Sequence, residues 1–151
     1  MLVGKEFTFD AAHFLPQYYG KCERMHGHTY KLRVVVEGKV GENGLVIDFV
    51  ILKRIVKRQV LDLLDHQVIN DVIKIASCEN TAQWIWEQLS DLETLIQQEL
   101  DDPNLPDSIT KYFNDQNGEG MDTSEFSDQV RLHEVTLWET PTSFASYQGS
   151  L

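Results

Sequence analysis

The sequence predicts an α+β fold, in which an antiparallel four-stranded sheet carries two helices on one face. Residues alternate between apolar and polar near both ends of the chain, whereas the middle repeats apolar residues at helical spacing. Strands and helices are therefore clustered, in the order β-β-α-α-β-β. A sheet covered on one face leaves its other face open, so we also expect the chain to form an oligomer.

Two strands begin the chain. Residues 5–13 and 28–37 each place an apolar residue or a histidine at almost every second position, which predicts strands with one buried face. The stretch that joins them is polar and contains proline and glycine, so it is read as a loop. A turn over residues 38–44 then leads to a short strand expected at 45–47, which would form a hairpin-like pair.

Two helices are expected in the middle of the chain. Asp48 is a good N-cap residue, and apolar residues then recur at helical spacing from Leu52 to Leu64. A second helix is expected from near Ser77 to about Leu100. Four basic residues on the polar side of the first helix are interpreted as a solvated face: Lys53, Arg54, Lys57 and Arg58.

The last third of the chain begins with an unusual segment. Residues 101–128 contain two prolines, two glycines and many acidic residues, and are read as a long loop or insertion. Residues 130–139 alternate again and predict a strand, and a last short strand is expected at 142–148. The chain is thus expected to be one domain over residues 1–151, with an acidic insertion at about 99–128.

Composition limits the classes of function. No apolar run approaches the ~18 residues that span a bilayer, and the first residues lack the apolar core of a secretory signal. Only two cysteines are present, which fits a reducing cytosol, so a cytoplasmic location is expected. The net charge of −11 argues against nucleic-acid binding. However, residues 99–128 hold nine acidic residues against Lys111 alone, so the remainder of the chain is compatible with an anionic ligand.

Three histidines suggest a metal site. His26 and His28 are two residues apart on an extended stretch, so both side chains point to one face, and His13 ends the neighbouring strand. Three imidazoles suit zinc and leave a fourth position open, which is the catalytic pattern. The alternative is a set of hydrogen-bonded strand histidines. A further alternative is that Cys22, four residues before His26, completes a closed structural CysHis₃ site.

Two further groups could handle protons. A cysteine beside a metal cluster could have a lowered pKa, so Cys22 could act as a base or nucleophile. Asp65 next to His66 could orient the imidazole and support its charged state. Adjacent residues at a helix end do not always face each other, so a surface helix terminus with a favourable histidine is the alternative.

Spaced motifs give a more specific indication. They are Phe7-x-Phe9-x-Ala11-Ala12-His13, Cys22-x-x-x-His26-Gly27-His28, Ile47-Asp48-Phe49, Leu64-Asp65-His66 with Asn70, and Leu137-Trp138-Glu139-Thr140. In this order they resemble the 6-pyruvoyltetrahydropterin synthase family over about residues 5–98 and 129–149. The three-residue gap between Cys22 and His26 is most similar to the bacterial 6-carboxytetrahydropterin synthase branch, which serves queuosine biosynthesis.

The resemblance implies a tunnelling fold that assembles into a hexameric barrel, a dimer of trimers, with active sites at subunit interfaces. It implies that Cys22 is the catalytic base, that Asp65 and His66 form a second proton-handling pair, and that Glu139 anchors the pterin ring. A carboxylate suits that role because it matches two parallel donors. The zinc ligands that the resemblance implies are His13, His26 and His28.

The implied reaction converts 7,8-dihydroneopterin triphosphate to 6-carboxy-5,6,7,8-tetrahydropterin, acetaldehyde and triphosphate. The alternatives are a 6-pyruvoyltetrahydropterin synthase, which eliminates triphosphate without cleaving the side chain, and a zinc- or pterin-binding module without activity. Arg24 is the best candidate for a contact with the triphosphate, although a solvated surface role is an equal alternative. Glu23 also precedes the His-Gly-His motif, as in a related subgroup without the cysteine, but the presence of Cys22 leaves it a minor role.

The chain departs from the family at one motif. The family usually has Asn-Pro-Thr-x-Glu before the second helix, whereas this chain reads Ile-Ala-Ser-Cys-Glu-Asn over residues 75–80. Ser77 keeps a hydroxyl at the threonine position, so an N-cap and a contact with the pterin are still expected there.

Overall fold

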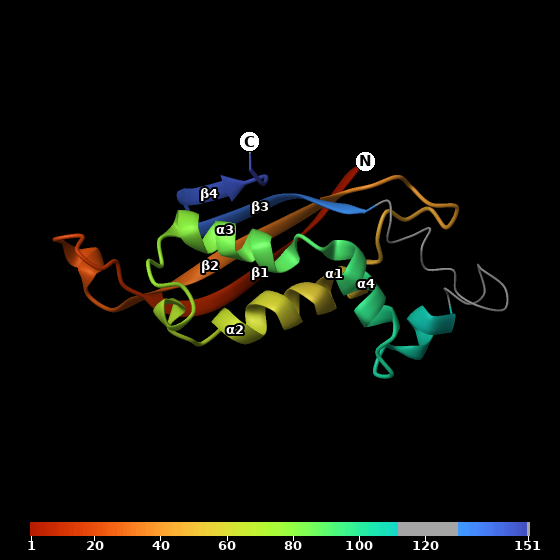
Figure 1. Ribbon diagram of the computed structural model, residues 1–151, viewed down its shortest axis with the longest axis horizontal. Helices are drawn as coiled ribbons and strands as arrows, with labels where there is room; N and C mark the ends of the chain where they lie inside the picture. Colours follow the sequence, from red (N-terminus) through yellow and green to blue (C-terminus); the bar gives the residue numbers. More distant parts are fainter. Residues whose placement is uncertain (112–129, 151) are drawn as a thin grey trace.

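Four strands form one antiparallel sheet in the computed structural model, which describes residues 1–111 and 130–150. Their order across the sheet is β1-β2-β3-β4, so each strand pairs with the strand that follows it along the chain (Figure 1). This confirms the expected antiparallel four-stranded sheet. The strands are β1 (Leu2–His13), β2 (His26–Glu37), β3 (Arg131–Thr140) and β4 (Ser143–Tyr147).

The long hairpin of β1 and β2 positions the histidines. Its register places Leu2 opposite Glu37 at one end and His13 opposite His26 at the other. The connecting loop contains a short 3-10 turn, η1 (Lys21–Glu23). Strand β2 begins at His26, two residues earlier than the alternation predicts, and this extension brings all three histidines to one end of the hairpin.

Helices cover one face of the sheet. The first helical stretch consists of α1 (Phe49–Val56), a π-helical turn η2 (Lys57–Leu61) and α2 (Asp62–Leu64). Its N-cap is Asp48, as expected, because the Asp48 carboxylate accepts a hydrogen bond from the Val50 amide at 2.7 Å. Helix α3 (Cys78–Leu89) packs on β3 and β4, while α1 and α2 lie against β1 (Figure 1).

The second expected helix is broken in two. It ends with α3 at Leu89 and resumes as α4 (Leu92–Leu100), which packs on α1. At the break, the Ser90 hydroxyl donates to the Glu87 carbonyl, and the Asp91 carboxylate accepts from the Thr94 amide. Short polar side chains thus replace the helical backbone bonds, and Asp91 caps a new helix.

The short strand expected at residues 45–47 is wrong. The Leu45 carbonyl accepts a hydrogen bond from the Gly41 amide at 2.8 Å, and the Leu45 amide donates to the Asn43 side chain at 2.9 Å. These bonds are satisfied within the turn, so no ladder is needed. Val46 and Ile47 are apolar because they are buried in the core between sheet and helices.

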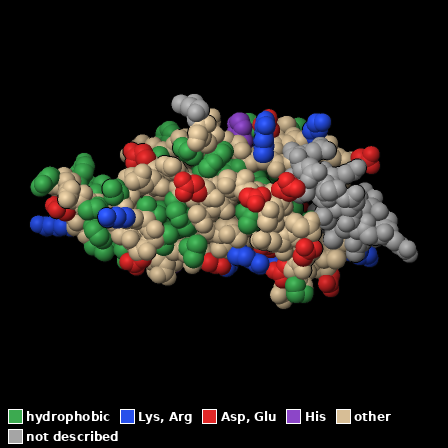
Figure 2. Space-filling view, in the orientation of Figure 1, with side chains coloured by type: hydrophobic (Ala, Val, Ile, Leu, Met, Phe, Trp, Pro, Cys, Tyr) green, Lys and Arg blue, Asp and Glu red, His purple; other side chains and the backbone are tan. Residues whose placement is uncertain are grey.

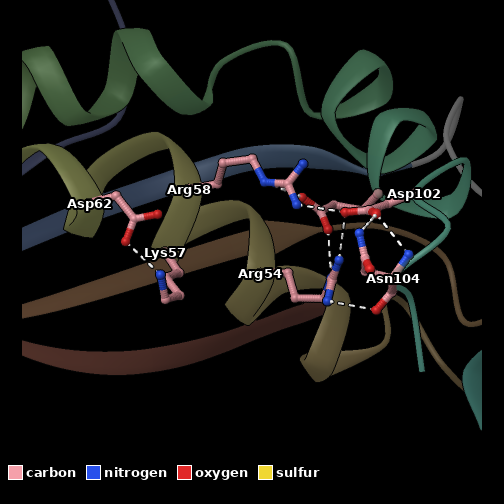
Figure 3. Close-up of polar contacts among 7 residues, drawn as sticks. Arg54, Lys57, Arg58, Asp62, Asp102 and Asn104 are labelled. Carbon is pink, nitrogen blue, oxygen red and sulfur yellow. Dashed lines mark hydrogen bonds and ion pairs between the residues drawn. The ribbon is translucent and has the colours of Figure 1, made fainter.

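The basic face of the first helix is only partly solvated. Arg54 donates from Nε to the Glu99 carboxylate at 2.6 Å and from Nη2 to Asp102 at 2.8 Å. Arg58 contacts the same two carboxylates, at 3.3 Å and 2.7 Å (Figure 3). The interpretation of a solvated face is therefore wrong for Arg54, which is only partly exposed, because packing of α4 on α1 brings acidic partners to it. Arg58 is exposed, as expected, although it shares these partners. Lys57 forms an exposed ion pair with Asp62.

The structure describes the acidic insertion only as far as residue 111. Within that part, Leu105 and Ile109 are buried in the core, so its first residues pack on the domain and do not form a free loop. Residues 112–129 lie outside the described residues, and the long loop expected there stays a prediction.

No helix in the described part of the chain is long and apolar enough to span a bilayer. Figure 2 shows exposed hydrophobic side chains gathered at the left end of the molecule. In the loop between β1 and β2, Tyr18, Tyr19 and Met25 are all more than half exposed. The cytoplasmic location expected from the sequence stays a prediction.

Candidate metal centre and active site

Three histidines from the end of the β1–β2 hairpin form one cluster. Each of His13, His26 and His28 offers a ring nitrogen, and these nitrogens all lie within 4.8 Å of one another. The alternation of the strands explains this arrangement, because all three side chains point to the helix-covered face of the sheet. Cys22 is not part of the group, so the structure does not support the closed CysHis₃ alternative.

Backbone carbonyls fix the orientation of two of the rings. His13 Nδ1 lies 2.6 Å from the Ala76 carbonyl oxygen, and His26 Nδ1 lies 2.7 Å from that of Arg24. Because a carbonyl oxygen only accepts, both Nδ1 atoms carry the proton and donate it. In the neutral rings the two Nε2 atoms are then left as acceptors.

These two Nε2 atoms lie 3.0 Å apart, so two lone pairs face each other. A bridging cation or an added proton relieves this arrangement. Tetrahedral zinc with imidazole ligands places neighbouring nitrogens roughly 3.3 Å apart. The side-chain geometry of this pair therefore fits a metal ion.

The third histidine also fits a metal ion. His28 Nε2 is buried and has no hydrogen-bond partner among the described residues. Burial lowers the pKa of His28, an effect partly opposed by the nearby Glu139 carboxylate and reinforced by His13 and His26. His28 is thus held in the neutral form, which is the form that binds a metal. All three histidines match the donor set of zinc.

Glu139 places a carboxylate beside the cluster. It lies near the end of β3, where the register with β4 shifts between Trp138 and Thr140. Its carboxylate oxygens lie 3.6 Å from His28 Nε2 and 3.9 Å from His13 Nε2. The structure therefore brings Glu139 to the metal cluster, where a bound ligand could also reach it.

Asp65 and His66 do face each other. His66 Nδ1 lies 2.9 Å from Asp65 Oδ1, and the same oxygen accepts a hydrogen bond from the Asp10 amide at 3.1 Å. The His66 amide donates in turn to the Asp10 carbonyl at 2.6 Å. His66 has a φ of 60°, a left-handed conformation that is uncommon outside glycine. The segment after α2 is therefore bonded to the outer edge of β1, which presents an oriented imidazole.

The His66 imidazole borders an open depression of about 410 Å³, which His28 also lines. The full lining consists of Asp10, Ala11, Ala12, Gly27, His28, Thr29 and His66. One residue of the proton-handling pair, His66, and one residue of the metal cluster, His28, thus line the same hollow at the end of the β1–β2 hairpin. The depression is open to solvent, so another surface or a substrate could enter it.

Cys22 stands apart from both groups. It lies half-buried in η1, and its carbonyl accepts a hydrogen bond from the Leu15 amide at 2.7 Å. Among the residues that the structure describes, no hydrogen bond joins its thiol to His66 or to the histidine cluster. The resemblance implies active sites at subunit interfaces, so Cys22 and His66 need not meet within one chain, and their shared role stays a prediction.

The two expected substrate contacts differ. Ser77 caps α3, since its hydroxyl accepts a hydrogen bond from the Asn80 amide at 3.2 Å. This N-cap was expected, and its contact with the pterin stays a prediction. The Arg24 side chain is exposed. Arg24 contacts the site through its backbone carbonyl, which accepts the hydrogen bond from His26 Nδ1.

Two residues near the cluster were not singled out from the sequence as site residues. Tyr30 is buried, and its ring has edge contacts with His13 and His28. Its position two residues after His28 on one strand was the available signal. Burial raises the pKa of the Cys78 thiol to about 11, with a smaller contribution from Glu139, and this thiol donates to the Leu137 carbonyl. No sequence pattern marked Cys78.

Comparisons with known proteins agree with this fold and site. Residues 2–102 match the family model for 6-pyruvoyl tetrahydropterin synthase. The 6-carboxy-5,6,7,8-tetrahydropterin synthase of Haemophilus influenzae is 35% identical over 157 residues, which covers 97% of each chain. The 6-pyruvoyl tetrahydrobiopterin synthase of Dictyostelium discoideum is 42% identical over 137 residues, covering 87% of this chain and 76% of its own.

The solved structure of Caenorhabditis elegans 6-pyruvoyl tetrahydropterin synthase shares the fold. It aligns with a TM-score of 0.67 at 24% identity, and the alignment covers 99% of this chain and 96% of the other. The fold and the histidine cluster define a pterin-synthase-like protein of the tunnelling type. The chain belongs to the 6-pyruvoyl tetrahydropterin synthase family.

Proposed function

We propose that the protein is a zinc-dependent lyase that converts 7,8-dihydroneopterin triphosphate to 6-carboxy-5,6,7,8-tetrahydropterin, acetaldehyde and triphosphate. The observation that carries the proposal is the cluster of three imidazoles with inward acceptor nitrogens and Glu139 beside them. The name of the Haemophilus influenzae relative, similar over almost the whole chain, favours the carboxy product. That product places the enzyme in queuosine biosynthesis.

The zinc ion would be held by His13, His26 and His28, and when bound it polarises substrate oxygens and acidifies the adjacent C–H bond. Glu139 anchors the pterin ring by accepting hydrogen bonds from a ring N–H and the amino group. Ser77 contacts the ring from the N-terminus of α3, and Arg24 contacts the triphosphate.

Proton handling is divided between two groups. The Cys22 thiolate removes a proton from the substrate side chain. His66 holds and returns a second proton, and Asp65 orients its ring and stabilises its charged form, which the 2.9 Å contact between them supports. The half-buried loop position of Cys22 leaves its thiol free to approach a substrate.

The active site is completed by a second copy of the chain. In support of this, no hydrogen bond among the described residues joins the Cys22 thiol to His66 within one chain, so the two groups would act together across an interface. The helix-free face of the sheet also exposes Phe144, which packs on Trp138. Lys31 and Arg33 lie over the Trp138 ring on the same face. The expected assembly is a homohexamer, a dimer of trimers.

A 6-pyruvoyltetrahydropterin synthase is the second candidate, and the Dictyostelium discoideum relative favours it. The deciding experiment incubates the zinc-loaded protein with 7,8-dihydroneopterin triphosphate and identifies the products by mass spectrometry and an acetaldehyde assay. Acetaldehyde with 6-carboxytetrahydropterin supports the lyase. A pyruvoyl product without acetaldehyde assigns the second candidate instead.

The variant Cys22→Ala serves as the control for the chemistry. It is expected to bind zinc with the same stoichiometry as the parent protein and to lose turnover. Full turnover in this variant would exclude Cys22 as the base. Loss of both metal and fold would indicate a structural CysHis₃ site, and absence of product from the parent protein despite tight zinc binding would indicate a binding module.

A further inference from the structure

The hydroxyl of Tyr30 is buried without a partner. Tyr30 is 1% exposed, and its Oη has no hydrogen-bond partner among the described residues. The ring itself is well packed, because it stacks on Phe9 with centroids 5.1 Å apart. Proteins seldom leave a buried hydroxyl unpaired, so an orphaned one beside a site needs an explanation. An apolar phenylalanine would fill this position as well.

The surroundings of Tyr30 belong to the candidate site. Its ring centroid lies 6.0 Å from that of His13 and 5.7 Å from that of His28. A tyrosine hydroxyl is protonated at neutral pH. The hydroxyl therefore keeps its proton and can act as a donor.

Glu139 is an acceptor that the strand register predicts to lie near Tyr30. Leu32 on β2 is paired with Leu137 on β3, and Lys31 with Trp138. This register, continued by one residue, predicts that Tyr30 and Glu139 are opposite each other, on the helix-covered face that Leu32 and Leu137 also occupy. Residues directly opposite have Cβ atoms roughly 5 Å apart. In the present arrangement the Glu139 carboxylate is directed instead at the nitrogens of His13 and His28.

We propose that Tyr30 is a positioning residue for Glu139, and the inference rests on the proposed function. When a metal ion occupies the histidine nitrogens, the Tyr30 hydroxyl donates a hydrogen bond to one carboxylate oxygen of Glu139. The carboxylate is then fixed in the orientation in which it accepts from the paired N–H donors of a pterin. This hydrogen bond would supply the partner that the buried Tyr30 hydroxyl lacks among the described residues.

The test uses Tyr30→Phe, which keeps the ring and its stacking on Phe9, with Tyr147→Phe as the matched control. The control also removes one tyrosine hydroxyl, but Tyr147 packs on Trp86, with ring centroids 5.6 Å apart. In the metal-free protein the thermal midpoint of Tyr30→Phe should be no lower than that of the control, because no hydrogen bond is lost. A clearly lower midpoint would overturn the proposal, since it would show that the hydroxyl already has a partner.

Binding is then measured on zinc-loaded protein, with 6-carboxypterin as the probe and fluorescence quenching as the signal. Tyr30→Phe should weaken pterin binding about tenfold, as expected for a lost hydrogen bond to a charged group, while zinc affinity changes less than about twofold. In the background of Glu139→Gln the same change should have little further effect. Unchanged pterin affinity, or full additivity with Glu139→Gln, would overturn the proposal.

A last readout separates this inference from the proposed function. Addition of zinc should change the ultraviolet absorption of tyrosine in the parent protein. This change should persist in Tyr147→Phe and be smaller in Tyr30→Phe. If it is equal in both variants, Tyr30 does not respond to the metal and the proposal fails. The parent protein could also make neither 6-carboxytetrahydropterin nor the pyruvoyl product, while the zinc-dependent change in absorption still depends on Tyr30. In that case the proposed reaction fails and the positioning role of Tyr30 stands.

Discussion

Replacing Arg54 with methionine is expected to destabilise the protein much more than the same change at Arg58. The Glu99 carboxylate is 2% exposed, and Arg54 supplies its shortest contact, at 2.6 Å, whereas Arg58 lies 3.3 Å from it. Breaking a buried ion pair costs about 3–5 kcal/mol, because the remaining charge is left without its partner. The retained contact with Arg58 offsets part of this cost, so we expect a loss of about 2–4 kcal/mol.

The Arg58 side chain is half exposed, and its removal leaves Glu99 with the shorter contact to Arg54. We therefore expect Arg58→Met to cost no more than about 1 kcal/mol, as for exposed ion pairs. The assay is thermal unfolding at fixed protein and zinc concentrations. At about 2–4 °C per kcal/mol for a domain of this size, the midpoint should fall by about 4–16 °C for Arg54→Met and by less than about 4 °C for Arg58→Met.

The double variant Arg54→Met/Glu99→Met tests the reasoning directly. It removes both charges from the buried position, so it should be more stable than Arg54→Met alone. If the double variant is no more stable than the single one, or if the two arginine variants unfold at the same temperature, the unpaired buried charge is not the cause. Figure 3 shows that Asp102 bridges both arginines, so it stays paired in either single variant.

Three other outcomes are expected. Hydrogen bonds from Arg58 and Asn104 hold the pKa of Asp102 at about 2, below its usual 3.8, so its stabilising contribution is complete above pH 4 and lost as pH falls toward 2. Arg58→Met should therefore move acid unfolding, followed by circular dichroism, to higher pH, and an unchanged midpoint would contradict this. The raised pKa of Cys78 should keep its thiol unreactive at pH 8, so iodoacetamide should modify Cys22 before Cys78. Mass spectrometry follows the two modifications, and equal rates would contradict this expectation. His13→Ala should abolish stoichiometric zinc binding measured by metal analysis, and retention of one zinc per chain would refute the proposed ligand set.

Periodic features of the sequence predicted most of the fold. His13 and His28 each alternate in step with the apolar residues of their own strand, which was sufficient to place both side chains on the buried face of the sheet. The N-cap at Asp48 was predictable for a similar reason, since a cap is a contact between residues two or three apart.

Features that depend on distant contacts were not predictable. Val46 and Ile47 looked like a strand because burial in a core and burial in a sheet select the same residues. Glu99 was counted in the acidic insertion at about 99–128, whereas it belongs to α4 and helix packing buries it against Arg54. The position of Cys22 was also beyond reach, because a loop has no periodicity from which to infer direction.

The orientation of His13 is set by a main-chain atom, the carbonyl oxygen of Ala76, and by no side chain at that position. Every amino acid supplies such a carbonyl, so mutation at position 76 leaves the hydrogen bond to the ligand chemically intact. This explains how the chain can carry Ile75 and Ala76 where its family usually has asparagine and proline, without disturbing the metal ligand. Ala76 is itself buried in the core, so position 76 is constrained by the packing of its side chain and by the path of its backbone, and the hydrogen bond to His13 depends only on the backbone.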